Sequence, residues 1–215
     1  MIVVIDYDAG NLRSVETALE HLNSDFVVSA NPEQVRGADT IIFPGVGEAA
    51  HAMGVLRRRG LDQALREAVG AGVPTLGICI GSQILLDESL EARDGVTRCI
   101  GLEAGTARFF SEDFAKRGIS GLKVPHMGWN QVQPVDGHPA SSLFDGIEPG
   151  SSFYFVHSYY PAPSDDAVTL GITEYGFPFV SAYGRGNLVA TQFHPEKSGP
   201  VGLKLLDNFI RNFGG

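Results

Sequence analysis

Short, fully apolar segments alternate with helical stretches in the first part of the chain. Ile2–Ile5 is a continuous β-branched run, which is typical of a strand covered on both faces. Apolar residues then recur at helical spacing from Leu12 to Leu22. Further strands are predicted at residues 25–29, 40–43 and 73–78, with a helix at residues 61–69. Strands that alternate with helices predict a parallel sheet.

The second half of the chain has a different rhythm. Its strand-like pieces are short and punctuated by glycine and proline, at residues 153–156, 168–172, 179–183 and 188–193. This pattern predicts antiparallel or mixed pairing, followed by a closing helix from Val201 to Ile210. We find no internal repeat and no low-complexity linker. A chain of 215 residues can bury one sizeable core, so we predict a single α/β domain with a mixed central sheet.

Composition excludes several classes of partner. The chain has 16 Lys and Arg against 25 Asp and Glu, a net charge of -9, and no basic stripe that would follow a phosphate backbone. It also has no apolar run of about 18 residues. We therefore expect neither a nucleic-acid partner nor a membrane. Two cysteines cannot form a disulfide framework, so a soluble, cytoplasmic protein is expected, with Cys99 an inert thiol.

Cys79 stands where the predicted strand at residues 73–78 meets a predicted helix at residues 80–86. Gly77 and Gly81 flank it in a Gly-x-nucleophile-x-Gly arrangement, which permits a sharp strand-to-helix turn. A thiol at a helix N-terminus faces the positive end of the helix dipole, and this favours the reactive thiolate. The alternative is a buried structural cysteine. Because both glycines are present, we favour a nucleophile.

A thiolate nucleophile needs a base, and the segment from Gln192 to Ser198 contains one. Pro195 biases His194 toward an extended backbone. In an extended segment the side chains at i and i+2 point the same way, so His194 and Glu196 are expected on one side of the chain. The carboxylate would orient the imidazole and stabilise its charged form, as the third member of a triad. Read alone, His-Pro-Glu is more often an ordinary surface turn. It becomes a candidate catalytic base only because the chain also contains a candidate nucleophile.

Acyl transfer also requires hydrogen-bond donors for the developing oxyanion. The backbone N–H of Ile80, directly after the nucleophile, is one candidate. Gly45, Val46 and Gly47 follow the strand at residues 40–43 and form a second candidate, because glycine permits unusual peptide orientations near a ligand. On local sequence alone, a plain β-turn explains this loop equally well.

Together these motifs resemble the class I glutamine amidotransferases. The resemblance is carried by Gly77-Ile78-Cys79-Ile80-Gly81-Ser82-Gln83 followed later by His194-Pro195-Glu196. More narrowly, the glutaminase subunits of imidazole glycerol phosphate synthase are similar at residues 6–15, 44–47, 125–130, 155–159 and 194–198. The likeness spans nearly the whole chain.

The resemblance implies a single three-layer α/β domain, residues 1–215, with a mixed, largely parallel central sheet. It further implies that glutamine is hydrolysed to glutamate through a thioester on Cys79. Ammonia would pass to a separate cyclase subunit of the (β/α)8-barrel type, forming a heterodimer that acts in histidine biosynthesis. The resemblance brings with it no metal and no other cofactor.

The same resemblance assigns further residues to the site. Gln83 is expected to contact the substrate glutamine, although without the family it would be read as an exposed helical residue. The backbone at His157, Ser158 and Tyr159 is expected to hold the amino-acid head of the substrate. Three more residues are expected to face the partner near the ammonia passage: Asn11, Tyr154 and Lys197.

Three departures from the family pattern concern local packing. Asp8 stands where the family usually has glycine, so a left-handed backbone there is harder but still open to an aspartate. Ser82 replaces the usual methionine, and Glu48–Ala50 follows the glycine loop where an aromatic residue is common. We therefore expect altered packing beside the oxyanion loop.

Two rival interpretations remain. Another glutaminase of the same class, serving anthranilate, guanine nucleotide or vitamin B6 synthesis, would use the same triad with a different partner. Lys197 and the segment at residues 125–130 argue against it. A non-catalytic binding or regulatory module on this fold would be expected to lack at least one triad residue, and all three are present.

Overall fold

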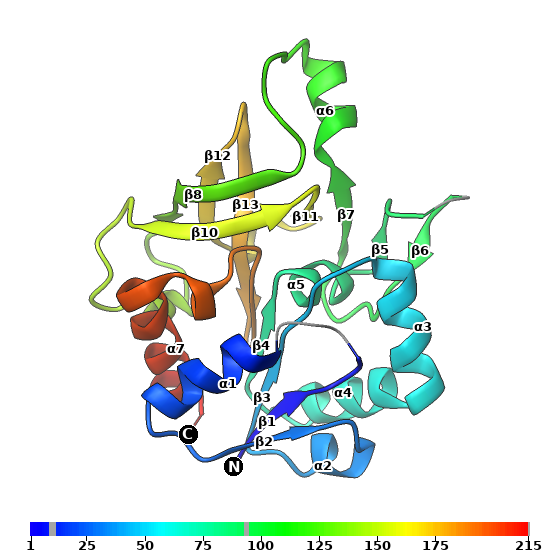
Figure 1. Ribbon diagram of the computed structural model, residues 1–215, viewed down its shortest axis with the longest axis vertical. Helices are drawn as coiled ribbons and strands as arrows, with labels where there is room; N and C mark the ends of the chain where they lie inside the picture. Colours follow the sequence, from blue (N-terminus) through cyan, green and yellow to red (C-terminus); the bar gives the residue numbers. More distant parts are fainter. Residues whose placement is uncertain (9–11, 93–94, 215) are drawn as a thin grey trace.

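A central sheet organises the molecule, whose computed structural model describes residues 1–8, 12–92 and 95–214. In this part of the chain eight strands pair in the order β2-β1-β3-β4-β14-β13-β12-β9 (Figure 1). The strands from β2 to β14 run parallel, and the pairs from β14 to β9 are antiparallel. The predicted mixed, largely parallel sheet is therefore confirmed. The bounds, in sheet order, are Phe26–Ser29, Ile2–Ile5, Thr40–Phe43, Thr75–Ile78, Leu188–Thr191, Pro178–Arg185, Thr169–Glu174 and Gln133–Pro134.

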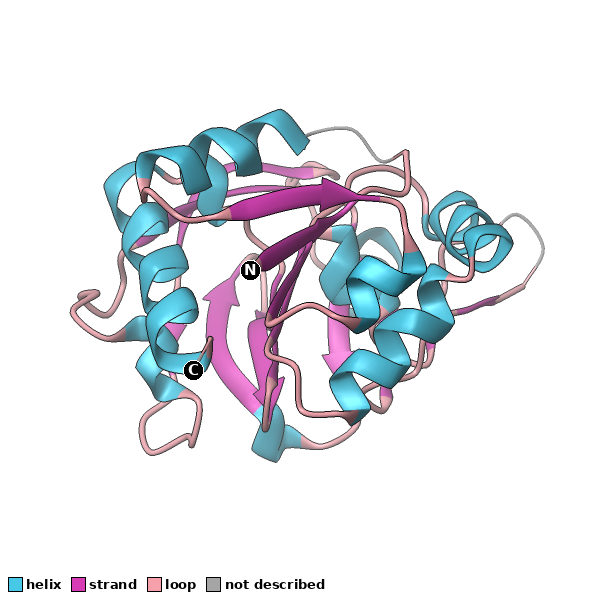
Figure 2. Ribbon diagram, turned by 90° about the horizontal axis from the view of Figure 1, so that it is seen from below, coloured by secondary structure: helices cyan, strands magenta, loops and turns pink. Residues whose placement is uncertain are grey.

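Helices cover both faces of the parallel part of this sheet, which gives the predicted three layers (Figures 1 and 2). One face carries α1 (Leu12–His21) and α7 (Gly199–Phe213). The other carries α2 (Pro32–Arg36), α3 (Ala49–Arg59) and α4 (Leu61–Gly70). No helix among the described residues is long and apolar enough to cross a membrane.

The two helical layers enclose separate hydrophobic cores because successive side chains of a strand point to opposite faces. In β1, Ile2 and Val4 belong to the core beneath α1 and α7. Val3 and Ile5 belong to the core beneath α2, α3 and α4. This arrangement explains why β1 reads as an unbroken apolar run: both of its faces are covered.

Two smaller sheets that the sequence did not predict lie beside the central one. Strands β8 (His126–Gln131) and β10 (Ser152–His157) form an antiparallel pair that crosses the molecule in Figure 1. The second small sheet has the order β11-β7-β5-β6. Its strands are Tyr159–Pro163, Gly105–Phe109, Glu88–Ser89 and Thr97–Arg98, and β7 leads into α6 (Phe110–Arg117). Three 3-10 turns complete the described elements: η1 (Ser141–Phe144), η2 (Asp166–Val168) and η3 (Pro195–Lys197).

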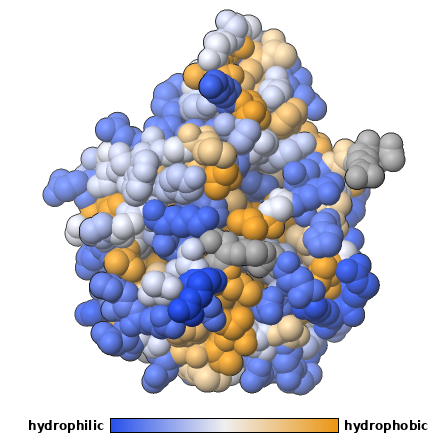
Figure 3. Space-filling model, in the orientation of Figure 1, coloured by the Kyte–Doolittle hydropathy of each residue, from blue (hydrophilic) through white to orange (hydrophobic). Residues whose placement is uncertain are grey.

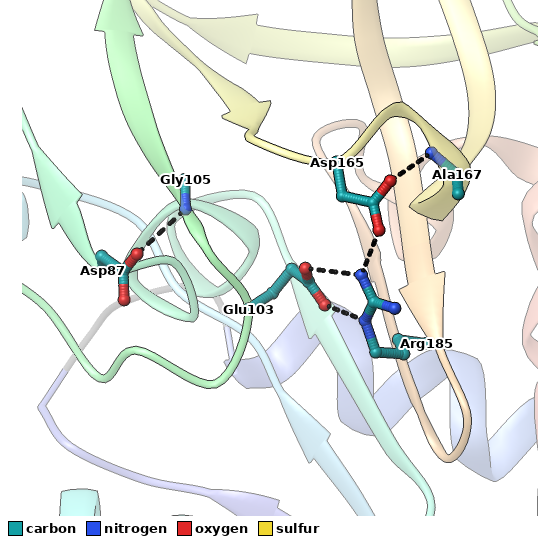
Figure 4. Close-up of polar contacts among 6 residues, drawn as sticks. All are labelled: Asp87, Glu103, Gly105, Asp165, Ala167 and Arg185. Atoms are coloured by element: carbon teal, nitrogen blue, oxygen red, sulfur yellow. Dashed lines mark hydrogen bonds and ion pairs between the residues drawn. The ribbon is translucent and has the colours of Figure 1, made fainter.

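An arginine at the end of β13 ties the loop before β7 and the start of η2 to the central sheet (Figure 4). The Arg185 guanidinium donates to both carboxylate oxygens of the buried Glu103, at 2.9 and 3.2 Å, and to Asp165 at 2.8 Å. These hydrogen bonds raise the pKa of Arg185, with Glu103 the larger cause. Asp87 in turn accepts from the backbone N–H of Gly105 at 3.2 Å. The loop that enters β7 is thereby fixed against the central sheet.

Candidate active site

Cys79 lies on a sharp turn between β4 and α5 (Ile80–Ile84), as the flanking glycines predict. A Cβ at Gly77 would come within 2.4 Å of Leu85, and one at Gly81 within 2.2 Å of the Phe43 carbonyl oxygen. Only glycine fits this close approach of strand and helix. The predicted helix at residues 80–86 is too long, because α5 ends at Ile84. The dipole that reaches the thiol therefore comes from little more than one helical turn.

The backbone of Cys79 is strained. Its φ of 55° and ψ of -110° lie in a region that residues with a side chain rarely occupy. Two contacts hold it there: its N–H donates to Thr191 O at 2.8 Å, and its C=O accepts from the Ser82 hydroxyl at 2.7 Å. Ser82, one of the three departures noted in the sequence, thus helps to hold the turn that carries the thiol.

His194 and Glu196 meet, although not by the predicted route. His194 Nδ1 lies 2.7 Å from Glu196 Oε1, and both side chains are buried. The chain is extended only at His194 and then turns through η3, so the pair is closed by a 3-10 turn rather than an extended segment. The His194 N–H donates to Tyr154 O at 2.9 Å, which fixes the start of that turn on β10.

The electrostatic environment favours a charged His194. Burial acts to lower the pKa of this imidazole, but the electrostatic and hydrogen-bonding interactions with Cys79 and with Glu196 outweigh it and raise the pKa to about 10. His194 Nε2 has no hydrogen-bond partner among the described residues. This nitrogen is therefore available to exchange a proton with the thiol or with a substrate, a contact that often tightens only when substrate binds.

The glycine loop after β3 lies beside the nucleophile. A Cβ at Gly45 would come within 1.7 Å of Tyr7 Oη and 2.2 Å of Ile80 Cγ2, so this position is a glycine because of close packing. Gly47 has a φ of 106°, a conformation that favours glycine. Val46 and Gly47 line the same pocket as Cys79. The loop therefore lies at the pocket that contains the thiol.

A pocket of about 300 Å³ opens at the thiol. Its lining residues come from the glycine loop, the turn at Cys79 and the segments at residues 125–130 and 155–159, with Glu91 in addition: Val46, Gly47, Cys79, Ile80, Gln83, Glu91, Pro125, Val156, His157, Ser158 and Tyr159. Its size lies at the lower end of the range for small-molecule sites. No group of three or more His, Cys, Asp and Glu side chains in the described ranges is arranged to hold a metal ion.

Gln83 is buried, which corrects its reading as an exposed helical residue. Its Nε2 donates to Tyr159 O at 2.9 Å and to Gln192 Oε1 at 2.8 Å. Gln192 Nε2 in turn lies 3.6 Å from Cys79 Sγ. Gln192 was noted only as part of the segment that contains the base, and its contact with the sulfur was not predicted.

Two buried histidines stand behind the pocket. His157 Nδ1 lies 2.7 Å from Tyr159 O, and His157 Nε2 lies 3.0 Å from His126 Nδ1. Burial lowers the pKa of His126 to about 4 and, with the nearby His126, that of His157 to about 3. Both imidazoles are therefore neutral at pH 7, and together they fix the backbone at residues 157–159.

Glu91 is a pocket residue that sequence reasoning missed. It lies outside every periodic segment and motif, so no local signal pointed to it. Its carboxylate accepts from the N–H of Ala49 at 2.8 Å, at the start of α3. Burial raises its pKa, the bond from Ala49 opposes this, and the charge of Glu48 adds to it. Glu91 thus caps the helix that follows the glycine loop, a task that the Glu48 side chain does not perform.

The expected partner-facing residues can be placed in part. Tyr154 is half-buried on β10, with its ring edge-on to Trp129 at 6.1 Å and 6.5 Å from the His194 ring. Lys197 is half-buried at the end of η3. Asn11 lies outside the described residues. Asp8 has the left-handed backbone expected there, with a φ of 65°, and pairs with Arg59.

The strained turn at Cys79, the buried His194–Glu196 pair and the pocket at the thiol define a class of enzyme, and the family comparison agrees. Residues 3–213 match the family model of class I glutamine amidotransferases, and the chain belongs to that family. Within it, the chain is 48% identical over 210 residues to imidazole glycerol phosphate synthase subunit HisH of Herpetosiphon aurantiacus, covering 98% of this chain and 93% of the relative. It is 46% identical over 212 residues to the protein of the same name from Methylococcus capsulatus, covering 98% and 95% of the two chains.

Solved structures share the fold at much lower sequence identity. A crystal structure of a glutamine amidotransferase superposes with a TM-score of 0.71 at 19% identity, covering 100% of both chains. A chain of PurLQS from Thermotoga maritima gives a TM-score of 0.70 at 18% identity, covering 98% of this chain and 97% of the other. At these identities the likeness establishes the three-layer fold alone.

Proposed function

We propose that this chain is the glutaminase subunit of an imidazole glycerol phosphate synthase, with residues 1–215 forming one glutaminase domain. It hydrolyses glutamine to glutamate. The ammonia passes to a (β/α)8-barrel cyclase subunit, which forms imidazole glycerol phosphate and aminoimidazole carboxamide ribonucleotide (AICAR) in histidine biosynthesis. The sequence identity of 46–48% to HisH subunits over nearly the whole chain favours this synthase over the others of the class.

One geometric observation carries the proposal. Strands β4 and β14 are parallel neighbours, and their carboxyl ends place Cys79 beside the turn that holds His194 and Glu196. The strained turn at Cys79 and the buried base belong to segments far apart in sequence and lie next to each other. A structural cysteine would need neither the strain nor the buried carboxylate.

The chemistry follows from these positions. The Cys79 thiol gives its proton to His194 Nε2, and the thiolate attacks the side-chain carboxamide carbon of glutamine. Backbone N–H groups of Ile80 and of the loop Gly45–Gly47 stabilise the oxyanion. His194 then protonates the departing nitrogen, which leaves as ammonia, and a thioester remains on Cys79. Water attacks the thioester with His194 as general base, releasing glutamate and restoring the thiol.

The rest of the pocket fits the amino-acid head of the substrate. The carboxylate of Glu91 provides a charge that complements an α-ammonium group. The backbone at His157, Ser158 and Tyr159, fixed from behind by the buried histidines, lines the same wall. Gln83 adds an amide oxygen, because its nitrogen is already engaged.

An exposed apolar face next to the site supports the proposed heterodimer. Met127 and Trp129 are 63% and 59% exposed on β8, opposite Val156 and Tyr154 of β10. Large hydrophobic side chains at this exposure are the anchors that interfaces favour. Figure 3 shows hydrophobic groups interrupting the hydrophilic surface at the level of these strands. We assign Tyr154 and Lys197 to this cyclase-facing surface, and Asn11 by the family pattern alone.

The proposal includes a cytoplasmic setting and no cofactor. Both cysteines are free, and a nucleophilic thiol must stay reduced to act. Cys99 is buried, and burial raises the pKa of its thiol to about 12, so it does not compete with Cys79.

Replacing Cys79 with alanine tests the proposal directly. In complex with the cyclase, Cys79→Ala should abolish synthesis from glutamine and leave synthesis from added ammonium salt intact, because the thiolate serves only the first half-reaction. Product formation is measured with each nitrogen source. Glutamine-dependent turnover by the variant would refute the nucleophile. Co-purification with a different synthase would refute the assignment to histidine biosynthesis.

A further inference from the structure

We propose that Gln192 is a further catalytic residue whose side-chain amide donates a hydrogen bond to Cys79 Sγ and stabilises the thiolate. Gln83 holds that amide in the donating orientation. The inference rests on the proposed role of Cys79 as the nucleophile, and it adds a donor that acts on the sulfur itself.

The position of Gln192 is fixed by the central sheet. It directly follows β14, its side chain is fully buried, and its N–H donates to Ser181 O at 2.8 Å. Because β14 runs parallel to β4, Gln192, the first residue after β14, lies beside Cys79, the first residue after β4. Gln192 Nε2 lies 3.6 Å from Cys79 Sγ, a length that suits an N–H donor and the large sulfur atom.

The orientation of the amide follows from its neighbours. Tyr159 O can only accept a hydrogen bond, so the Gln83 group 2.9 Å away must be its NH2. The same NH2 lies 2.8 Å from the Gln192 side chain, which must therefore present its oxygen. Gln192 is left with its NH2 toward the sulfur. A flipped amide would place two NH2 groups against each other.

Tyr159 O, the acceptor at the start of this series of hydrogen bonds, is itself held in place. Tyr159 O also accepts from His157 Nδ1 at 2.7 Å. Since His157 is neutral, its Nε2 must accept, and His126 Nδ1 donates to it at 3.0 Å. Asn130 Nδ2 closes the row at 3.2 Å from His126 Nε2. Every donor in this row has an acceptor, so the carbonyl that orients the Gln83 amide is itself fixed.

A donor at this place favours one protonation state of the sulfur. A thiol is a weak acceptor, whereas a thiolate is charged and forms a stronger hydrogen bond. Cys79 Sγ lies 4.0 Å from Val156 O, a long contact for an S–H donor. The proton that leaves Sγ passes to His194 Nε2, so the step moves one proton and leaves a thiolate–imidazolium pair. The Gln192 amide and the imidazolium then both stabilise the negative charge on the sulfur.

The test is the reactivity of the thiol in the full-length chain. Iodoacetamide alkylation of Cys79 is followed by mass spectrometry at pH 7, with Cys79→Ala measuring background from the buried Cys99. Gln192→Met keeps the length of the side chain and removes the donor. Gln192→Glu keeps the acceptor for Gln83 but presents a carboxylate to the sulfur. Alkylation should slow about ten-fold in Gln192→Met and more in Gln192→Glu, the size expected for one hydrogen bond to a charged group.

Two further measurements separate this role from a structural one. Thr173→Val removes a different buried hydrogen bond of the sheet, the 2.8 Å contact with Ser181, and should leave the alkylation rate unchanged. In the complex, Gln192→Met should lower kcat for glutamine with KM within about two-fold, because the amide contacts the sulfur and not the substrate.

Wild-type alkylation rates in both folded Gln192 variants would overturn the inference, as would a Thr173→Val chain slowed equally. If Gln192→Met fails to fold, the alkylation rate of Gln192→Glu alone tests the inference. Rapid, Gln192-dependent alkylation in a complex that does not hydrolyse glutamine would support the inference and refute the proposed function. A wild-type chain alkylated no faster than Cys79→Ala would overturn both.

Discussion

Because the backbone of Cys79 is strained, we predict that the Cys79→Gly variant is more stable than the Cys79→Ala variant. Cys79→Ala and Cys79→Gly both remove the thiol, so neither is catalytic and only the backbone preference differs. A residue with a Cβ held at φ 55° and ψ -110° costs about 1–3 kcal/mol, which glycine avoids. Glycine loses about 0.5–1 kcal/mol in extra chain entropy on folding. The net advantage of glycine is therefore about 1 kcal/mol, within a range of roughly 0–2.5 kcal/mol.

Urea-induced unfolding of the full-length chain, followed by circular dichroism, measures this difference. In a domain of this size, 1 kcal/mol corresponds to about 2–4 °C in Tm, so thermal unfolding provides a second reading. Ala115→Gly, at an exposed position within α6, is the control and should be destabilising by about 0.5–1 kcal/mol. An alanine variant at position 79 as stable as the glycine variant, or more so, would refute the strain argument.

Three further outcomes are expected. Glu196→Ala should keep about ten- to a hundred-fold more glutaminase activity than His194→Ala, because the carboxylate orients the base but carries no proton; equal rates in one assay would contradict this. Gly45→Ala should lower the free energy of unfolding in urea by at least about 1–3 kcal/mol, because the new Cβ would lie 1.7 Å from a buried tyrosine hydroxyl. The folded-state pKa of His157, about 3, lies below its ordinary value of 6.5, so stability is fully present above pH 6.5 and falls with pH below it. The protonation of His157 should contribute a slope that approaches about 1.4 kcal/mol per pH unit, so urea titrations should show a smaller loss of stability between pH 7 and 5.5 in His157→Gln.

The elements that the sequence specified best are those whose local pattern has a single physical explanation. The run at Thr40–Phe43 was predicted with its observed bounds because a short run of β-branched and aromatic residues is typical of a strand buried on both faces. The turn at Cys79 was predicted from the flanking Gly77 and Gly81, and the structure explains both glycines, because a Cβ at either position would clash. Each inference needed only a few neighbouring residues.

The elements that were missed depend on partners distant in sequence. Strand β8 contains Gly128 and Asn130, residues that disfavour strands, and it forms through pairing with β10. Gln83 reads as polar and exposed, and its burial is explained only by acceptors that lie 76 and 109 positions away. Glu91 reaches the pocket through a contact 42 positions away. No local pattern records such contacts.

The place of β14 in the central sheet has a consequence for the nascent chain. Strand β14 inserts between β4 and β13, and Gln192 lies 113 positions after Cys79. At roughly 5–20 residues per second on the ribosome, β4 waits on the order of ten seconds before its neighbour is synthesised. Until then β4 is an apolar edge, with a row of unpaired N–H and C=O groups open to other chains. The strand that brings the base to the nucleophile is thus also the one that closes this edge, and the triad cannot assemble before the sheet is protected from aggregation.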